Sequence, residues 1–205
     1  MDVLRLAREP DVCDGATMSG SDSLVVRARR GDEDAFRMIF ERYARPLLAF
    51  IYDMVGERAL AEELTQETFV RAYKNLSALR DERRFGVWLF GIAKNVARES
   101  LRSHPRRERE TLIDDERVLA MSDNQPSPAG ILLDKELQRV MRAALQSLDE
   151  DKRLVFILKI FHHKSYDEIA AITGFTIAKL KTDLHRARAE MRRRIRPYLE
   201  AGHEV

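Results

Sequence analysis

The sequence has little cysteine and no long uncharged stretch, and both absences exclude whole classes of protein. Cys13 is the only cysteine in 205 residues, so the chain can form neither an internal disulfide framework nor a cysteine-based zinc cluster. The longest stretch without a charged residue is ten residues, whereas a membrane-spanning helix needs about 18. The N-terminus has no apolar segment followed by a cleavage site. We therefore expect a cytoplasmic protein without membrane insertion.

Turn-forming and aromatic residues are also few, which bears on the fold class. The chain has nine glycines and six prolines, and aromatic residues make up 7%. A sandwich or barrel needs many more turn residues. Apolar residues instead recur every three or four positions, as in the segment Phe85, Trp88, Leu89, Ile92 and Val96, and no segment alternates clearly with period two. The sequence therefore predicts an all-α protein, with Trp88 in its core.

The distribution of charge and proline divides the chain into four segments. Residues 1–22 show no apolar period and hold two basic and five acidic groups, so we expect a disordered leader, with Met18 as an alternative start. Residues 23–103 and 134–205 are helical in pattern and carry net charges of +3 and +4. Between them, residues 104–133 contain three prolines and a net charge of −2. A structureless segment this long is uncommon inside one domain, so we expect two small helical domains joined by a flexible acidic linker.

The second domain contains the most informative local pattern. Ser165 is followed three residues later by Glu168, which is the spacing of a capping box. Gly174 can end the helix that this box opens, and Thr176 can cap a second, long helix. Two helices joined by a tight glycine turn form a helix-turn-helix unit. The second helix has an apolar stripe on one side, consisting of Ile177, Leu180, Leu184, Ala187 and Met191.

The outer face of this second helix is polar and basic. From Thr176 to Arg196 there are eight basic residues against Asp183 and Glu190. Side chains in the first turns of such a helix can meet base edges in the major groove, and those farther along can meet phosphate. A three-helix packing unit with a basic exterior is the alternative interpretation, but this concentration of charge favours DNA binding.

Three segments together resemble one protein family. "AEELTQETFVRAYKNL", "RFGVWLFGIAKNVARESLR" and "SLDEDKRLVFILKIFHHKSYDEIAAITGFTIAKLKTDLHRARAEMRRRI" resemble, in order, the diagnostic segments of extracytoplasmic-function (ECF) sigma factors, group 4 of the sigma-70 family of bacterial RNA polymerase sigma factors. The resemblance covers residues 23–198. It implies a region 2 domain at 23–103, for polymerase binding and minus-ten recognition, and a region 4 domain at 134–205, for minus-thirty-five recognition.

The resemblance also implies roles for individual residues. "ELTQETF" resembles the segment that docks on the clamp helices of the largest polymerase subunit, and its polar positions are Glu63, Gln66, Glu67 and Arg71. "FGVWLFGIAKN" resembles the helix that melts the minus-ten element, and the preceding loop, residues 77–84, resembles the loop that captures a flipped base. Here the base would be held by Phe90 and Asn95, and phosphate would be bound by Arg80, Arg83, Arg84, Lys94 and Arg98.

The positions that would read the minus-thirty-five element lie on the long C-terminal helix. They are Lys179, Lys181, Thr182, His185, Arg186 and Arg188. The chain departs from the family at Ala178-Lys179-Leu180, where Gly-Thr-Val is usual, and at Asp183, where a basic residue is frequent. We expect Lys179 to make an ionic phosphate contact and Asp183 to remove one favourable charge.

The implied partners are core RNA polymerase, through its clamp helices and flap, promoter DNA and an anti-sigma factor, which could tether the chain at the membrane. The acidic linker, with Asp114, Asp115 and Glu116, resembles a connector that passes through the polymerase, and an inert tether is its alternative. No catalytic or cofactor motif is present, so we expect no enzyme activity, no cofactor and no metal. The alternative function is a stand-alone helix-turn-helix transcriptional regulator, which would need neither the docking nor the melting segment.

Overall fold

The computed structural model describes residues 18–103 and 128–201, and every regular element in these two ranges is helical. The first range contains α1 (Met18–Arg29), α2 (Glu33–Val55), α3 (Arg58–Lys74) and α4 (Phe85–Ser103). The second contains α5 (Pro128–Gln146), α6 (Glu150–Phe156), α7 (Tyr166–Thr173) and α8 (Ile177–Ala201). The all-α prediction is confirmed. Most of the expected leader and linker lies outside the described residues, although α1 and α5 begin inside those segments, at 18 and 128.

The helix-turn-helix forms through the local signals that the sequence contains. The Ser165 hydroxyl accepts a hydrogen bond from the Glu168 backbone N–H, and the Glu168 carboxylate accepts one from the Ser165 N–H, which completes the capping box. Gly174 ends α7 at φ 78°, a left-handed conformation that favours glycine. The Thr176 hydroxyl accepts from the Lys179 N–H at 3.3 Å at the start of α8. All three predictions about this turn are confirmed.

The apolar stripes of the helices mostly face the core, and this confirms the prediction made for α8. The stripe of α3 (Ala61, Leu64, Thr68 and Ala72) is buried, as are Leu180, Leu184, Ala187 and Met191 of α8. Trp88 is partly buried and packs against the core, with its ring 5.7 Å from that of Phe85. Ile177 is an exception: it is the first residue of α8 and of the predicted stripe, and it is 41% exposed because it stands at the end of the helix. Phe40 of α2 is also 41% exposed, although its ring lies 4.6 Å from that of Phe69 in α3.

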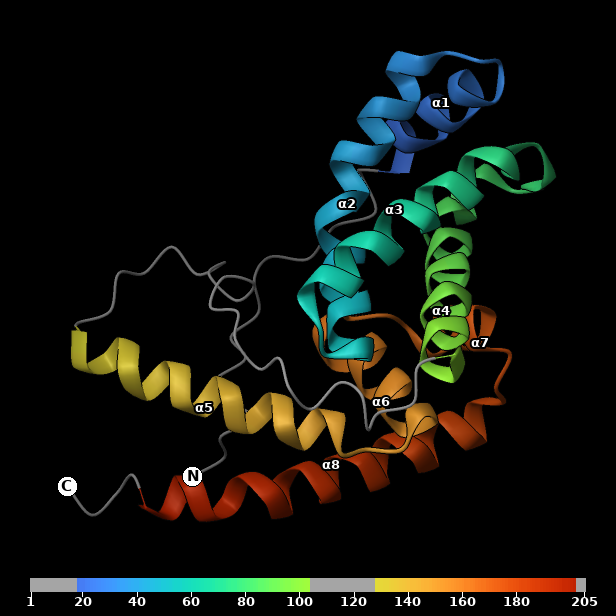
Figure 1. The fold of residues 1–205 in the computed structure, drawn as a ribbon. Coiled ribbons are helices and arrows are strands. Elements are labelled where there is room, and N and C mark those ends of the chain that lie inside the picture. Colours follow the sequence, from blue (N-terminus) through green and yellow to red (C-terminus); the bar gives the residue numbers. More distant parts are fainter. Residues whose placement is uncertain (1–17, 104–127, 202–205) are drawn as a thin grey trace.

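The two halves of the chain pack against each other, which the expectation of two freely tethered domains did not include. Figure 1 shows α6 and α7 against the ends of α2 and α4. Helix α6 contacts α2, and α7 contacts α4. Arg153 of α6, which is buried, donates to the backbone oxygen of Met54 at 2.7 Å. Gln146 of α5 donates to the backbone oxygen of Asp53 at 2.8 Å. One continuous hydrophobic core therefore runs through both halves.

Candidate polymerase and nucleic-acid interfaces

The polymerase-binding residues predicted on α3 lie on one side of that helix. Glu63 and Gln66 are exposed, and Glu67 and Arg71 are half-buried. The Arg71 guanidinium binds Glu67 and Glu99 of α4, each at 2.7 Å, and these carboxylates raise the pKa of Arg71. Arg71 thus orders one end of this surface by tying α3 to α4.

Two apolar side chains extend the same side of α3 and were not predicted. Val70 and Tyr73 are 46% and 51% exposed, which is high for large hydrophobic residues. They follow Glu63 and Gln66 at helical spacing, so these residues share a face. We call Glu63, Gln66, Glu67, Val70 and Tyr73 the α3 surface. An apolar centre beside charged groups is common where proteins associate, and a period of three or four through 63, 66, 70 and 73 was the signal available in the sequence.

The basic loop before α4 presents its predicted residues to solvent. The loop contains two short 3₁₀ turns, Leu76–Ala78 and Glu82–Arg84. Arg80, Arg83 and Arg84 are all exposed. The Asp81 carboxylate accepts from the Arg83 backbone N–H at 3.1 Å and so caps the second turn. The three arginines are available for phosphate, as the prediction requires.

The predicted residues on α4 divide into one that is accessible and three that are covered. Asn95 is exposed. Lys94 is half-buried and donates to the backbone oxygen of Ile172 in α7 at 2.9 Å; its pKa is lowered by burial and by the nearby charge of Arg98. Arg98 binds the carboxylates of Glu150 and Asp151 in α6. In this arrangement neither Lys94 nor Arg98 can bind phosphate.

Phe90 is a clearer correction. Its side chain is only 3% exposed, and its ring lies 5.3 Å from that of Phe50 and 5.2 Å from that of His162. Phe90 therefore belongs to the core that joins the two halves and does not form the wall of a base pocket here. The sequence assigned Phe90 to the same helical segment as Asn95. No local pattern in the sequence indicated that His162 packs against Phe90.

The exposed face of α8 has the composition predicted for a DNA-reading helix. Lys181, Thr182, His185, Arg186 and Arg188 are exposed. Lys179 is the exception, because its ammonium group lies 3.0 Å from Asp151 and also binds Asp183. Asp183 is 8% exposed. Lys179 is therefore occupied by carboxylates, and Asp183 points toward the protein interior instead of toward DNA.

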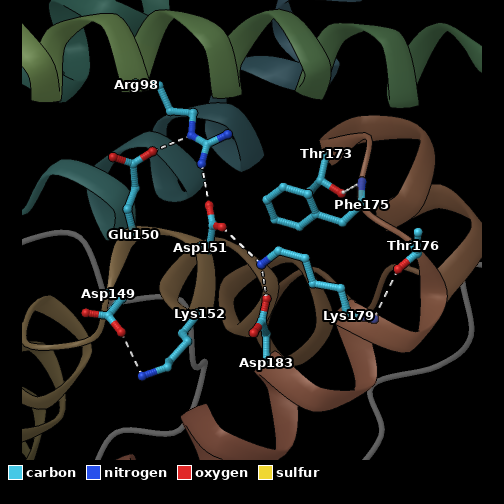
Figure 2. A network of polar contacts seen from close by, with 10 residues as sticks. All are labelled: Arg98, Asp149, Glu150, Asp151, Lys152, Thr173, Phe175, Thr176, Lys179 and Asp183. Carbon is cyan, nitrogen blue, oxygen red and sulfur yellow. Dashed lines mark hydrogen bonds and ion pairs between the residues drawn. The ribbon is translucent and has the colours of Figure 1, made fainter.

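These contacts form one charged network between the two halves (Figure 2). Asp151 is its centre, because its two carboxylate oxygens bind Arg98 of α4 and Lys179 of α8. The Lys179 ammonium group also lies 4.1 Å from the centroid of the Phe175 ring, a cation–π distance. We call Arg98, Glu150, Asp151, Lys179 and Asp183 the inter-domain network.

Neither a metal-binding cluster nor a membrane-spanning helix is found in the part of the chain that the structure describes. Within residues 18–103 and 128–201, no three His, Cys, Asp or Glu side chains are grouped so that they could hold a metal ion. No described helix is both long enough and apolar enough to cross a bilayer.

The family follows from two matches in sequence order. Residues 39–107 match the family model for Sigma-70 region 2, and residues 138–191 match that for Sigma-70, region 4. Together they cover more than half of the chain. The chain belongs to the sigma-70 family of RNA polymerase sigma factors. Region 2 of this sigma factor includes most of α2 and all of α3 and α4, and region 4 includes α6, α7 and the first part of α8. A stand-alone regulator has no need of region 2, so that alternative is wrong.

Curated relatives agree along almost their whole length. This sigma factor is 29% identical over 189 residues to the RNA polymerase sigma-H factor of Pseudomonas aeruginosa, covering 89% of this chain and 97% of that one. It is 28% identical over 182 residues to the ECF RNA polymerase sigma-E factor of Escherichia coli K12, covering 86% and 94%. These similarities place it among the ECF sigma factors.

Two solved structures share the fold of this sigma factor. CnrH, solved in complex with the cytosolic domain of CnrY, superimposes with a TM-score of 0.62 at 23% identity, over 88% of this chain and 97% of that one. The sigma factor RpoE from Bartonella quintana, solved in complex with the anti-sigma factor NepR, gives a TM-score of 0.62 at 21% identity, over 78% and 96%. At these identities the likeness shows the fold alone.

Sequence reasoning missed Glu150 and Asp151 in the inter-domain network of this sigma factor. Acidic residues in the first turn of a helix are common because they favour the helix dipole. "DED" at 149–151 therefore has an ordinary local explanation, and nothing nearby in the sequence indicates that two of these carboxylates bind Arg98 of α4.

Proposed function

We propose that this sigma factor binds core polymerase through its α3 surface, opens promoters with the basic loop and α4, and reads the minus-thirty-five element with α8. The observation that supports this proposal most is that one chain presents an exposed amide on α4, the helix that follows the basic loop, within its match to region 2, and an exposed basic helix face within its match to region 4. In this proposal the reaction itself belongs to the polymerase, and the chain contributes binding and positioning.

The exposed face of α8 suits the major groove. Lys181, Thr182, His185 and Arg186 lie within its first three turns, and Arg188 follows on the next turn. Lysine and arginine can bind guanine O6 and N7, and a hydroxyl or imidazole can bind other base edges. The arginines from Arg192 onward are better placed for phosphate, which fixes register without carrying sequence information.

Asn95 suits capture of a single unpaired base. Its side chain is exposed on α4, whose opposite side is held in the core by Leu89, Ala93 and Val96. Asparagine is a mediocre helix former, so an exposed one in mid-helix has no stabilising role of its own. Its amide offers both a donor and an acceptor, as recognition of a base edge requires. The three exposed loop arginines can hold the phosphates on either side.

We predict that Asn95→Ala leaves folding and polymerase assembly intact and impairs opening of a duplex promoter. Loss of one good base contact corresponds to about 1–3 kcal/mol. Permanganate footprinting on a duplex promoter, compared with a pre-melted template, measures the step. Asn75→Ala, which removes another exposed amide, is the matched control. Wild-type opening by the variant, or equal failure on both templates, would contradict a role in base capture.

The free chain should bind duplex DNA weakly, and the inter-domain network supplies a geometric reason. Arg98 and Lys179 are predicted DNA contacts from different regions, and both are held by Asp151. Lys94 is covered by α7. The Asp151 carboxylate thus occupies the position that a DNA phosphate would take beside Arg98 on α4 and beside Lys179 on α8. We propose that the network keeps region 2 and region 4 closed on each other until polymerase separates them.

We predict that Asp151→Lys opens the free chain. The new ammonium group would repel both Arg98 and Lys179, while Glu150 and Asp183 would still pair with them, so no buried charge is left alone. Paired spin labels at Ser77→Cys and Ala189→Cys, in a Cys13→Ser background, report the distance between the halves; both label sites are exposed. The open-to-closed ratio should rise roughly tenfold, and added salt should open the wild type.

Asp149→Lys is the matched control for this prediction. Asp149 lies two residues away, binds only Lys152 among the described contacts at 2.7 Å, and is largely exposed. The two variants have the same net charge, so any difference in distance or in affinity for a short duplex comes from position. Equal behaviour of the two variants, or a distance in the wild type that does not respond to salt, would refute the network as a closing device.

We further propose that an anti-sigma factor holds this chain in the cytoplasm. Two proteins of the same fold were solved in complex with another protein, in one case named as an anti-sigma factor. The α3 surface, with its exposed Val70 and Tyr73, is accessible to such a partner in the closed arrangement. Co-purification of a partner from the source cell, lost on Val70→Asp, would support this proposal.

A further inference from the structure

The guanidinium of Arg29 joins two points of the loop that precedes α4. It donates to the backbone oxygen of Leu79 at 2.7 Å through Nη2, and Nη1 lies 2.9 Å from the Glu82 carboxylate. Leu79 and Glu82 bracket Arg80 and Asp81, so one side chain fixes both ends of this short stretch. The rigid fork of an arginine can hold two acceptors at once in fixed directions.

Arg29 itself is held in place by the packing of α1. Val25 and Ala28 on the same helix are buried in the core, and α1 is in contact with α2 and with the turn at Glu82–Arg84. The neighbouring Asp32 caps α2 and binds Arg27 at 2.7 Å, which secures the turn between α1 and α2. The donor of both loop contacts is therefore attached to a fixed support.

The loop has its own two 3₁₀ turns, the second capped by Asp81, and Arg29 is the side chain that ties them to another helix. Arg80, Asp81, Arg83 and Arg84 are exposed, and Leu79 is buried. Without Arg29, the Leu79 backbone oxygen and the Glu82 carboxylate would hydrogen-bond to water instead. The loop, with its exposed arginines, would then be free to adopt many conformations. Arg29 itself precedes the match to region 2, which begins at residue 39.

We propose that Arg29 is a positioning residue for promoter opening: it holds the loop at residues 77–84 in the shape that receives an unpaired base beside Asn95. This inference rests on the proposed function of the loop. Arg29 is 32% exposed and engaged with protein acceptors, so it is not itself assigned a DNA contact. It acts through the loop that displays Arg80, Arg83 and Arg84.

The first test measures the loop in the full-length free protein, independently of any function. In Arg29→Gln the amide hydrogens of residues 77–84 should exchange at least about tenfold faster, since two contacts of a charged donor are lost. Glu82→Gln keeps the Leu79 contact and should give an intermediate rate. Arg30→Gln, which changes the exposed arginine immediately after α1, should match the wild type. Unchanged exchange in Arg29→Gln would overturn the proposal.

The second test uses the assembled holoenzyme on duplex and pre-melted promoters. Arg29→Gln should slow opening of the duplex roughly tenfold and leave activity on the pre-melted template and affinity for core polymerase unchanged. Arg29→Lys, which can reach one acceptor at a time, should recover part of the rate. A loosened loop with wild-type opening would overturn the positioning role. If Asn95→Ala opens promoters normally, the proposed function of the loop fails, whereas the exchange result still decides whether Arg29 orders it.

Discussion

Reversing the charges of Glu63 and Glu67 together, as Glu63→Lys and Glu67→Lys, should weaken binding to core polymerase by roughly a hundredfold. Glu63 is exposed at the N-terminal end of the α3 surface. Glu67 is bound to Arg71, which is also bound to Glu99, so the second change places a cation against Arg71 and turns that side chain away from its present position. A partner that is complementary to the α3 surface would lose its attraction to the two carboxylates. It would also lose the order that Arg71 gives to one end of that surface.

The measurement is a competition assay for core polymerase against a labelled reference sigma factor. The helix should remain folded, because the stripe that anchors α3 (Ala61, Leu64, Thr68 and Ala72) is on its opposite, buried side. Glu33→Lys with Glu41→Lys makes the same change in net charge on exposed positions of α2 and should compete as the wild type does. Equal affinity of the two double variants would show that α3 is not the docking helix.

Asp53→Asn should stabilise the protein above pH 7 by about 2–4 kcal/mol. Asp53 lies near the end of α2, where α5 covers it, and burial raises the pKa of its carboxyl to about 7, although the nearby charge of Arg142 acts in the opposite direction. The unfolded chain releases this proton near pH 4, so between about pH 4 and 7 the folded state holds a proton that the unfolded state has lost. Stability therefore falls as the pH rises through this window, and the asparagine variant does not suffer that loss.

His162 gives the opposite pH dependence and sharpens the test. Its burial between Phe50 and Phe90 lowers the pKa of the imidazole to about 4, with help from the charges of Lys164 and His163. The neutral imidazole of His162 makes its full contribution to the free energy of unfolding above pH 6.5, and this contribution is lost as the pH falls toward 4. In the wild type the two groups partly cancel below pH 6.5. In Asp53→Asn only the His162 effect remains, so stability should rise with pH up to about 6.5 and then stay level.

Denaturant unfolding of both proteins at intervals from pH 5 to pH 8 measures this difference. Asp34→Asn is the control, because Asp34 is an exposed carboxylate on the same helix that binds Arg37 at the surface; it should leave the pH profile unchanged. If the free energy of unfolding of Asp53→Asn followed the same pH dependence as that of the wild type, burial would not raise the pKa of the Asp53 carboxyl.

Residues of the candidate site differ in how far the sequence alone could assign them. The positions on the outer face of α8 after Lys179 are exposed as expected, because the buried stripe that begins at Leu180 leaves them no other side to occupy. Phe90, Lys94, Arg98 and Lys179 were assigned to DNA, and each is covered or paired in the structure. Helical periodicity assigns a residue to a side of its own helix, but it does not say whether a second helix lies over that side.

The sequence by itself determined the helices, their caps and the division into regions 2 and 4. The capping box at Ser165, the left-handed Gly174 and each step of the buried stripe of α3 involve residues no more than four positions apart. The spacing of residues in the sequence is therefore enough to predict such contacts. Only the tertiary structure decided that Asp151 joins Arg98 to Lys179, that Arg29 holds Leu79 and that burial raises the pKa of Asp53. Arg98 and Asp151, like Arg29 and Leu79, are about fifty positions apart in the chain. Such pairs form because packing of the apolar faces brings them together, and no spacing in the sequence encodes that approach.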